Sequence, residues 1–222
     1  MLDTPTNLKS LLKDPTLLRT QAYVNGAWID GEGTFDVINP ARGDVIAQVT
    51  DLTRAQVTEA IAAAEVAQKD WAKWTGKERS AVLRRWFDLM VENTDDLATI
   101  LTAEMGKPLA EAKGEIGYGA SFIEFFAEEA KRIYGETIPG HQRDKRITVI
   151  KQPIGVAASI TPWNFPNAMI TRKAAPALAA GCAMVARPAE LTPLSALALG
   201  VLAERAGIPA GVLNIVTTSD AS

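Results

Sequence analysis

Residues 160 to 173 read ITPWNFPNAMITRK and set a few polar side chains into an otherwise apolar and aromatic run. Asn164 supplies an uncharged amide, while Arg172 and Lys173 supply cations. If a helix starts near the second proline, Lys173 follows Met169 by four residues and Arg172 follows it by three, so their faces overlap. Such a group of side chains predicts ligand binding or metal-free chemistry.

The composition of the chain excludes several classes of protein and of metal site. The chain has 222 residues, 47% of them hydrophobic, and a net charge of -3 with acidic and basic residues interspersed, so no broad cationic face is expected for a nucleic acid. The single cysteine, Cys182, and single histidine, His141, exclude a disulfide within this chain, a cysteine-rich metal site and a two-histidine metal site. No apolar stretch of membrane-spanning length or secretory signal pattern is evident, so we expect a cytoplasmic protein.

The first half predicts short strands followed by a helical block, residues 1–135 together. AYVNGAWI and FDVINPARGDVIAQV have the pattern of hairpins, the first with an Asn-Gly turn. Helices are expected from Thr53 and Thr75, each with a capping box, then from Asp95 to Met105 and from Pro108 to Tyr134. The helical spacing predicts that these aromatic side chains lie in the core: Trp71, Trp74, Trp86, Phe122, Phe125 and Phe126. One of the three phenylalanines could instead line a ligand tunnel.

The second half predicts an exposed β-ribbon and then an α/β sheet. KRITVIKQ alternates between flanking loop signals, so residues 136–154 are expected to form a ribbon of the kind that often makes subunit contacts. Within residues 155–222, the apolar runs IGVAASI, CAMVA and GVLNIV are separated by helical segments Asn167–Ala180 and Thr192–Ala206. This β-α-β-α-β order predicts an open parallel sheet with helices on its faces.

The carboxyl ends of these strands are where a ligand is expected. The first strand runs into Thr161 to Asn164 and the second into Arg187 to Glu190, although neither loop is a glycine-rich phosphate cradle. After the third strand comes a cluster of helix-capping residues, Thr217 to Ser222, with no helix behind it. We therefore expect the chain to be part of a longer protein whose sheet continues.

Several motifs also resemble the N-terminal half of the aldehyde dehydrogenase superfamily: TPWNFP, RPAELTPLSALAL and AGIPAGVLNIV. The resemblance runs from the Asn25-Gly26 hairpin to the C-terminus. AEMGKPLAEAKGEIGYGASFIEFFAEEAKRIYGETIPG and MITRKAAPALAAGC are similar to the succinate-semialdehyde dehydrogenases of that family. The resemblance implies the N-terminal part of that α/β fold, with a Rossmann-like sheet, a helical block and a ribbon for homo-oligomer formation.

The resemblance also implies roles for individual residues. In the family a cysteine thiolate attacks the aldehyde, and Asn164 matches the asparagine that donates to the resulting negative oxygen. The apolar Trp163, Phe165 and Met169 would exclude water around that bond. Arg172 matches the arginine that holds the distal carboxylate of a semialdehyde, so uncharged aldehydes should be poor substrates. Lys173 either assists Arg172 in binding the substrate or is an ordinary lysine on the helix surface.

For the cofactor, NAD or NADP, the resemblance implies two sets of contacts. The nicotinamide side would be bordered by Ile160, Thr161, Pro162 and Trp163, and the adenosine ribose side by Arg187, Pro188, Ala189 and Glu190. Arg187 stands where the family usually has lysine and would favour the 2′-phosphate of NADP, whereas Glu190 would repel it and favour NAD. Arg187 and Glu190 could also form only a local ion pair.

The family's nucleophilic cysteine, general-base glutamate and glycine-rich turn have no match in this chain. Cys182 lies in an apolar run and is expected to be an inert, buried residue, so residues 1–222 alone should have no dehydrogenase activity. Glu104, Glu111 and Glu115 are expected on a polar helix face without a catalytic role, and His141 in an exposed loop. The resemblance implies that the complete protein oxidises succinate semialdehyde to succinate with NAD or NADP. The alternatives to this function are a dehydrogenase for another semialdehyde, such as glutarate semialdehyde, or a non-catalytic protein that binds a dinucleotide or a partner.

Overall fold

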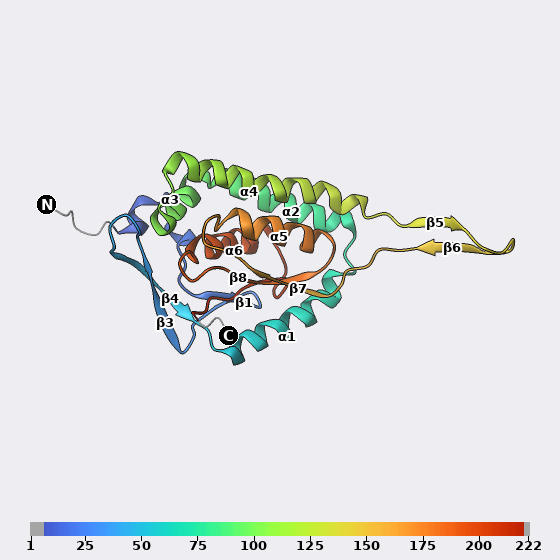
Figure 1. Cartoon of the computed structure of the whole chain (residues 1–222), viewed down its shortest axis with the longest axis horizontal. Helices are drawn as coiled ribbons and strands as arrows, with labels where there is room; N and C mark the ends of the chain where they lie inside the picture. The colour runs from blue at the N-terminus through green and yellow to red at the C-terminus, as the bar shows by residue number, and fades with distance from the viewer. Residues whose placement is uncertain (1–6, 220–222) are drawn as a thin grey trace.

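A mixed five-stranded sheet forms the centre of the molecule, in the order β2 (Ala27–Ile29), β1 (Ala22–Val24), β9 (Leu213–Ile215), β8 (Ala183–Arg187) and β7 (Val156–Ile160). The computed structural model describes residues 7–219. Helix α1 (Arg54–Trp71) covers one face of the sheet, and α5 (Ala168–Ala179) and α6 (Leu194–Ala206) cover the other. Helices α2 (Gly76–Glu92), α3 (Thr94–Met105) and α4 (Leu109–Glu129) form a further layer over α5 and α6 (Figure 1).

Three parallel strands make up the predicted core of the sheet: β7 (Val156–Ile160), β8 (Ala183–Arg187) and β9 (Leu213–Ile215). Their side chains are largely apolar, as expected for strands covered on both faces. In the register, Ile160 pairs with Arg187, so both strands end at the same edge of the sheet. The predicted β-α-β-α-β order and the α/β fold class are therefore confirmed.

The N-terminal hairpin joins this sheet, which the sequence did not indicate. Strands β1 (Ala22–Val24) and β2 (Ala27–Ile29) flank Asn25 and Gly26, whose φ angles of 51° and 75° confirm the expected turn. β1 then pairs antiparallel with β9. The buried side chain of Asn214 fixes this junction, because it accepts from the Asn25 backbone N–H at 2.9 Å and donates to the Gly211 carbonyl at 2.8 Å.

The helical block follows the local signals closely. Capping boxes at Thr53 and Thr75 start α1 and α2 (Gly76–Glu92), and Gly106, with φ 81°, ends α3 (Thr94–Met105). Helix α4 (Leu109–Glu129) is continuous across its glycines and leads into the short η3 (Ala130–Arg132). Trp71 and Trp86 are buried as predicted, but Phe125 is 58% exposed, so its assignment to the core was wrong.

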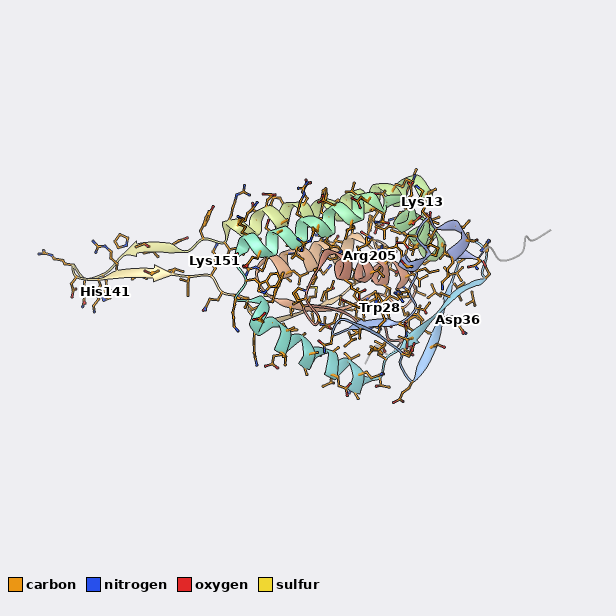
Figure 2. The ribbon with its side chains drawn as sticks, turned by 180° about the vertical axis from the view of Figure 1, so that it is seen from behind. Lys13, Trp28, Asp36, His141, Lys151 and Arg205 are labelled. Atoms are coloured by element: carbon orange, nitrogen blue, oxygen red, sulfur yellow. The ribbon has the colours of Figure 1, made fainter. Side chains whose placement is uncertain are left out.

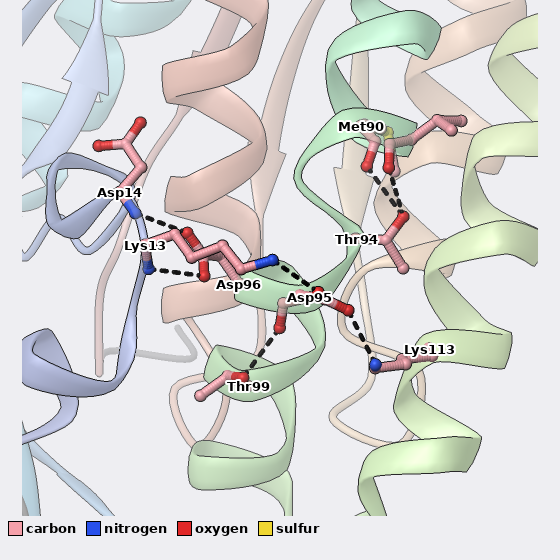
Figure 3. A network of polar contacts seen from close by, with 9 residues as sticks. Lys13, Asp14, Met90, Thr94, Asp95, Asp96, Thr99 and Lys113 are labelled. Atoms are coloured by element: carbon pink, nitrogen blue, oxygen red, sulfur yellow. Dashed lines mark hydrogen bonds and ion pairs between the residues drawn. The ribbon is translucent and has the colours of Figure 1, made fainter.

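Residues 7–17, where the described chain begins, pack on α3 and α6. They form the 3-10 turns η1 (Leu8–Leu11) and η2 (Pro15–Leu17). Asp96 accepts from the backbone N–H groups of Lys13 and Asp14, at 2.9 and 2.8 Å, while Asp95 pairs with the side chains of Lys13 and Lys113 (Figure 3). A second hairpin, β3 (Gly33–Ile38) and β4 (Val45–Asp51), lies beside this segment.

A two-stranded ribbon projects from the opposite end of the molecule (Figure 1). Strands β5 (Glu136–Pro139) and β6 (Arg146–Val149) pair antiparallel, and every residue in them is exposed. His141 lies at the far end, where Figure 2 labels it, which agrees with its predicted exposure. The ribbon packs against nothing else in the described part of the chain.

Candidate active site

Two loops meet at the carboxyl edge of the parallel strands. The Thr161 backbone N–H donates to the Arg187 carbonyl at 3.1 Å, and the Thr192 hydroxyl lies 3.5 Å from the Trp163 carbonyl. These contacts bring the segment 160–164 alongside the segment 187–190, as the sequence predicted. The structure thus places both predicted sets of cofactor residues on one edge of the sheet.

An apolar groove of about 310 Å³ lies between α1 and the sheet and runs past this edge. Arg187 borders it, and the Arg187 guanidinium also donates to the Thr218 carbonyl at 3.2 Å. Glu190 is exposed near the same edge. The other lining residues are Val57, Ile61, Val156, Ala157, Ala158, Ser159, Ile160, Val185, Val216 and Thr218. An apolar groove with a cation at its border has the chemistry to hold a nucleotide.

Asn164 lies in the loop between β7 and α5, and its side chain is exposed. Among residues 7–219 the side-chain amide has no hydrogen-bond partner, so its donors are available to a ligand. Its neighbours Trp163 and Phe165 are 52% and 37% exposed. Residues 7–219 thus shield these two rings only in part, and the expected exclusion of water stays a prediction for the complete protein.

The first turns of α5 carry the predicted substrate residues. Pro166 precedes the helix, and the Met169 backbone N–H donates to the Phe165 carbonyl at 2.9 Å, which joins the Asn164 loop to the helix. Arg172 is exposed and lies within 4.0 Å of the Met169 sulfur. Lys173 donates to the Met169 carbonyl at 3.2 Å, and partial burial together with the Arg172 charge lowers the pKa of Lys173.

Two glutamates that were expected on a polar helix face are instead buried, so this part of the prediction was wrong. The Glu104 carboxylate accepts from the backbone N–H groups of Leu194 and Ser195, at 2.7 and 2.8 Å, and so caps α6. Burial raises the pKa of Glu104 to about 8, against the effect of these hydrogen bonds. Glu115 caps α5 in the same way, whereas Glu111 is exposed.

A signal for these buried glutamates was present in the helical spacing. Glu104 follows Leu97, Ile100 and Leu101 by seven, four and three residues, and all three leucine and isoleucine side chains are buried. A glutamate on the apolar stripe of a helix indicates a buried carboxylate that needs hydrogen-bond donors. The donors come from the N-terminus of α6 for Glu104 and from that of α5 for Glu115. The local sequence does not show which helices supply them.

Cys182 is buried and directly precedes β8, next to the start of β7, where the Ala183 N–H bonds the Gly155 carbonyl at 3.2 Å. Asn164 follows the other end of β7. The two residues thus lie at opposite ends of the parallel strands, so Cys182 is placed to pack and not to attack a ligand beside Asn164.

The described residues show neither a metal site nor a membrane span. Nowhere in residues 7–219 do three or more histidine, cysteine, aspartate or glutamate side chains gather as metal ligands would. None of the helices in that range is long and apolar enough to cross a membrane.

Comparison with known proteins identifies relatives of this chain. Residues 28–222 match the model of the aldehyde dehydrogenase family. The chain is 67% identical to glutarate-semialdehyde dehydrogenase of Pseudomonas putida over 210 residues, and 62% identical to succinate-semialdehyde dehydrogenase [NADP(+)] of Escherichia coli over 210 residues. Each match covers 94% of this chain and 44% of the relative, so the chain spans less than half the length of these proteins.

Solved structures agree with these matches. A crystal structure of an E. coli NADP-dependent enzyme superposes with a TM-score of 0.94 at 61% identity, over 95% of this chain and 44% of the other. Betaine aldehyde dehydrogenase from Staphylococcus aureus in complex with NAD+ superposes with a TM-score of 0.91 at 33% identity, over 96% of this chain and 43% of the other. The match over residues 28–222 shows that the chain belongs to the aldehyde dehydrogenase family.

Proposed function

We propose that the protein carrying these residues oxidises an aldehyde with a distal carboxylate, using NAD or NADP. Succinate semialdehyde is the substrate we favour, and glutarate semialdehyde is the alternative, since relatives at 62% and 67% identity carry these names. The observation that carries the proposal is the Asn164 loop leading directly into a helix that presents an exposed guanidinium, Arg172.

Asn164 would act on the aldehyde oxygen. When a nucleophile attacks the carbonyl carbon, that oxygen gains negative charge, and the Asn164 amide can donate to it without itself titrating. The exposed amide of Asn164 lacks a competing partner among residues 7–219, which supports this role. Met169 and Phe165 would line the path between this donor and Arg172.

Arg172 would bind the distal carboxylate. A planar guanidinium suits bidentate pairing with a carboxylate, and no acidic side chain in the described part of the chain pairs with Arg172. A four-carbon or five-carbon semialdehyde would place its reacting carbonyl toward Asn164 while its carboxylate stays on Arg172.

For the cofactor, the groove beside α1 fits one part of a dinucleotide. Its apolar walls would take a flat ring, while Arg187 and Glu190 at the edge of the sheet would face the ribose. The bound nicotinamide would accept the hydride that leaves the aldehyde carbon. Ile160, Thr161, Pro162 and Trp163 would border it, with Pro188 and Ala189 completing the second loop.

The ribbon of residues 136–154 is proposed as the contact between subunits of a homo-oligomer. Its cross-strand pair Ile138 and Ile147 is exposed, at 39% and 43%, and lies far from the sheet. An exposed apolar pair on an isolated hairpin indicates a surface that is buried against another protein.

The proposed function is tested with the complete protein and with residues 1–222. The complete protein should reduce NAD or NADP with succinate or glutarate semialdehyde at least tenfold more efficiently than with butanal or pentanal. Residues 1–222 should bind a cofactor in titration calorimetry but turn nothing over, because the single cysteine, Cys182, is buried away from Asn164. Equal efficiency with charged and uncharged aldehydes would contradict the proposed substrate class.

A tighter complex with NAD or with NADP in the same titration would show which of Arg187 and Glu190 dominates. Arg187→Ala should weaken the binding of NADP more than the binding of NAD if the guanidinium faces a 2′-phosphate. Arg84→Ala is the matched control, because Arg84 lies on α2 and pairs with Asp88 and Glu124, away from the groove. Turnover by residues 1–222 alone would contradict the inert role assigned to Cys182.

A further inference from the structure

The loop that carries Asn164 is held from the side by a buried ion pair. The Lys107 ammonium lies 2.5 Å from the Glu115 carboxylate, and the two side chains are 10% and 1% exposed. Lys107 directly precedes the N-cap of α4, and Glu115 lies on the second turn of that helix. The pair thus lies at the start of a long helix of the outer layer, while the other contacts of both side chains reach the loop.

The Lys107 ammonium makes two contacts with consecutive residues of the loop. It donates to the Asn164 backbone carbonyl at 3.2 Å and lies 3.9 Å from the centre of the Phe165 ring. A compact ammonium with three N–H donors can serve a carboxylate, a carbonyl and a ring face at once. Lys107 therefore fixes the backbone at Asn164 itself.

Glu115 completes the arrangement on the other side of the loop. Its second carboxylate oxygen accepts from the backbone N–H groups of Asn167 and Ala168, at 3.0 and 3.2 Å. The pair therefore holds the chain both at Asn164 and at the first turn of α5, with Pro166 between them. Pro162 and Pro166 have no N–H of their own, so the loop depends on such outside contacts.

We propose that Lys107, held by Glu115, is a positioning residue for Asn164. The proposal rests on the proposed function in one respect, that Asn164 donates to the aldehyde oxygen. Such a donor must be held within a fraction of an ångström, and a misplacement of about 1 Å can cost about 10²-fold in rate. Lys107 touches the backbone of Asn164 and leaves its side chain exposed for the substrate.

The first test is nuclear magnetic resonance relaxation of residues 1–222. In the wild type the backbone amides of Asn164 and Phe165 should have order parameters of about 0.85, as for rigid backbone. Lys107→Met should lower them to about 0.6 or below. Lys113→Met is the matched control, because Lys113 on the same helix pairs only with Asp95 at the surface and should leave the loop unchanged.

Lys107→Met alone leaves the Glu115 carboxylate buried without its cation. That unpaired charge can itself unfold the loop, apart from any loss of the Lys107 contact with Asn164. The double variant Lys107→Met with Glu115→Gln has no unpaired buried charge and keeps an oxygen for the Asn167 and Ala168 donors. It should regain most of the wild-type resistance to urea, while the Asn164 amide stays mobile because its contact with the ammonium is still missing. A double variant with wild-type order parameters would overturn the proposal.

The second test measures turnover in the complete protein. The double variant should lower kcat for succinate semialdehyde by about 10- to 100-fold, with KM and cofactor affinity within about twofold, because only the oxyanion donor is misplaced. Lys113→Met should match the wild type. An active wild type and an equally active double variant would reject the positioning role. An inactive wild type would reject the proposed function instead, and the relaxation data would still decide whether Lys107 orders the Asn164 loop.

Discussion

Arg172 on α5 and Phe122 on α4 form a cation–π contact, with 5.5 Å between the guanidinium carbon and the ring centre. The Phe122 ring is itself held by the edge of Tyr118, at 4.7 Å between ring centres. Apart from this ring and a weak contact of Nη1 with the Met169 sulfur at 4.0 Å, the exposed guanidinium has no side-chain partner among residues 7–219. An exposed guanidinium without an acidic partner is available to pair with a substrate carboxylate.

Arg172→Ala is therefore expected to lower kcat/KM for succinate semialdehyde by about 10- to 100-fold while butanal oxidation stays within about twofold. The matched control is Arg84→Ala, which removes a similar guanidinium, 4.7 Å from the Phe87 ring on α2, far from the Asn164 loop. Steady-state kinetics with both aldehydes measures the discrimination. Undiminished preference for the semialdehyde in Arg172→Ala would remove Arg172 from the substrate site.

Glu104 gives the stability of the fold a particular pH dependence. Its folded pKa is raised from the ordinary 4.5 to about 8, so in this window the folded protein holds a proton that the unfolded chain releases. The contribution of Glu104 is fully present below about pH 4.5 and is lost as the pH rises toward about 8, with a slope of at most about 1.4 kcal/mol per pH unit.

Glu104→Gln should remove this slope, because a glutamine does not titrate. Urea unfolding of residues 1–222 at pH 5.5, 6.5 and 7.5 compares the two proteins, and groups common to both cancel in the difference. The free energy of unfolding should fall more steeply with pH in the wild type than in the variant. Parallel profiles would mean that Glu104 is ionised in the folded protein throughout this range.

Glycines on α4 should respond in opposite directions to alanine. A Cβ at Gly119 would press on the Asn167 side-chain oxygen and lie 3.1 Å from the Thr171 hydroxyl of α5. Gly119→Ala should therefore lower the free energy of unfolding by about 1–3 kcal/mol, because the added methyl group overpacks this contact between α4 and α5. A Cβ at Gly117 would meet no side chain or other element within 4 Å, so Gly117→Ala should raise the free energy of unfolding by about 0.5–1 kcal/mol from helix propensity alone.

Urea denaturation of the two alanine variants beside the wild type checks both signs. Equal changes at the two positions would show that α4 and α5 are not in the close contact described at Gly119.

The proposed subunit contact makes a prediction about the ribbon. Ile138→Asp should reduce the complete protein to a smaller assembly in light scattering, since Ile138 and its partner Ile147 share one face of the ribbon. Thr148→Asp, on the other face, is the control. The melting temperature of residues 1–222 should change little in either variant, because the ribbon is exposed along its whole length. A wild type that is already monomeric would contradict the proposed contact.

The sequence predicted those features whose determinants are local. The capping boxes at Thr53 and Thr75 and the turn at Asn25 each depend on residues within four positions, and all three formed as expected. The order of apolar runs also sufficed for the parallel strands, because few topologies fit that order.

Features that depend on distant partners were missed. Glu115 finds its donors 52 and 53 residues away, and β1 meets β9 at the other end of the described chain. No local pattern encodes such partners, because they are set by how whole helices pack. The residues of the candidate site were found through family motifs, while the contacts that hold them, above all Lys107 with Asn164, needed the structure.

The central claim is that Asn164 donates a hydrogen bond to the reacting aldehyde oxygen. The most direct measurement is kcat for succinate semialdehyde in the complete protein, wild type against Asn164→Ala, with cofactor affinity measured in both. The account predicts a loss of about 10²- to 10³-fold in kcat with unchanged cofactor affinity, because one oxyanion donor is removed. A variant that keeps wild-type kcat would contradict the account.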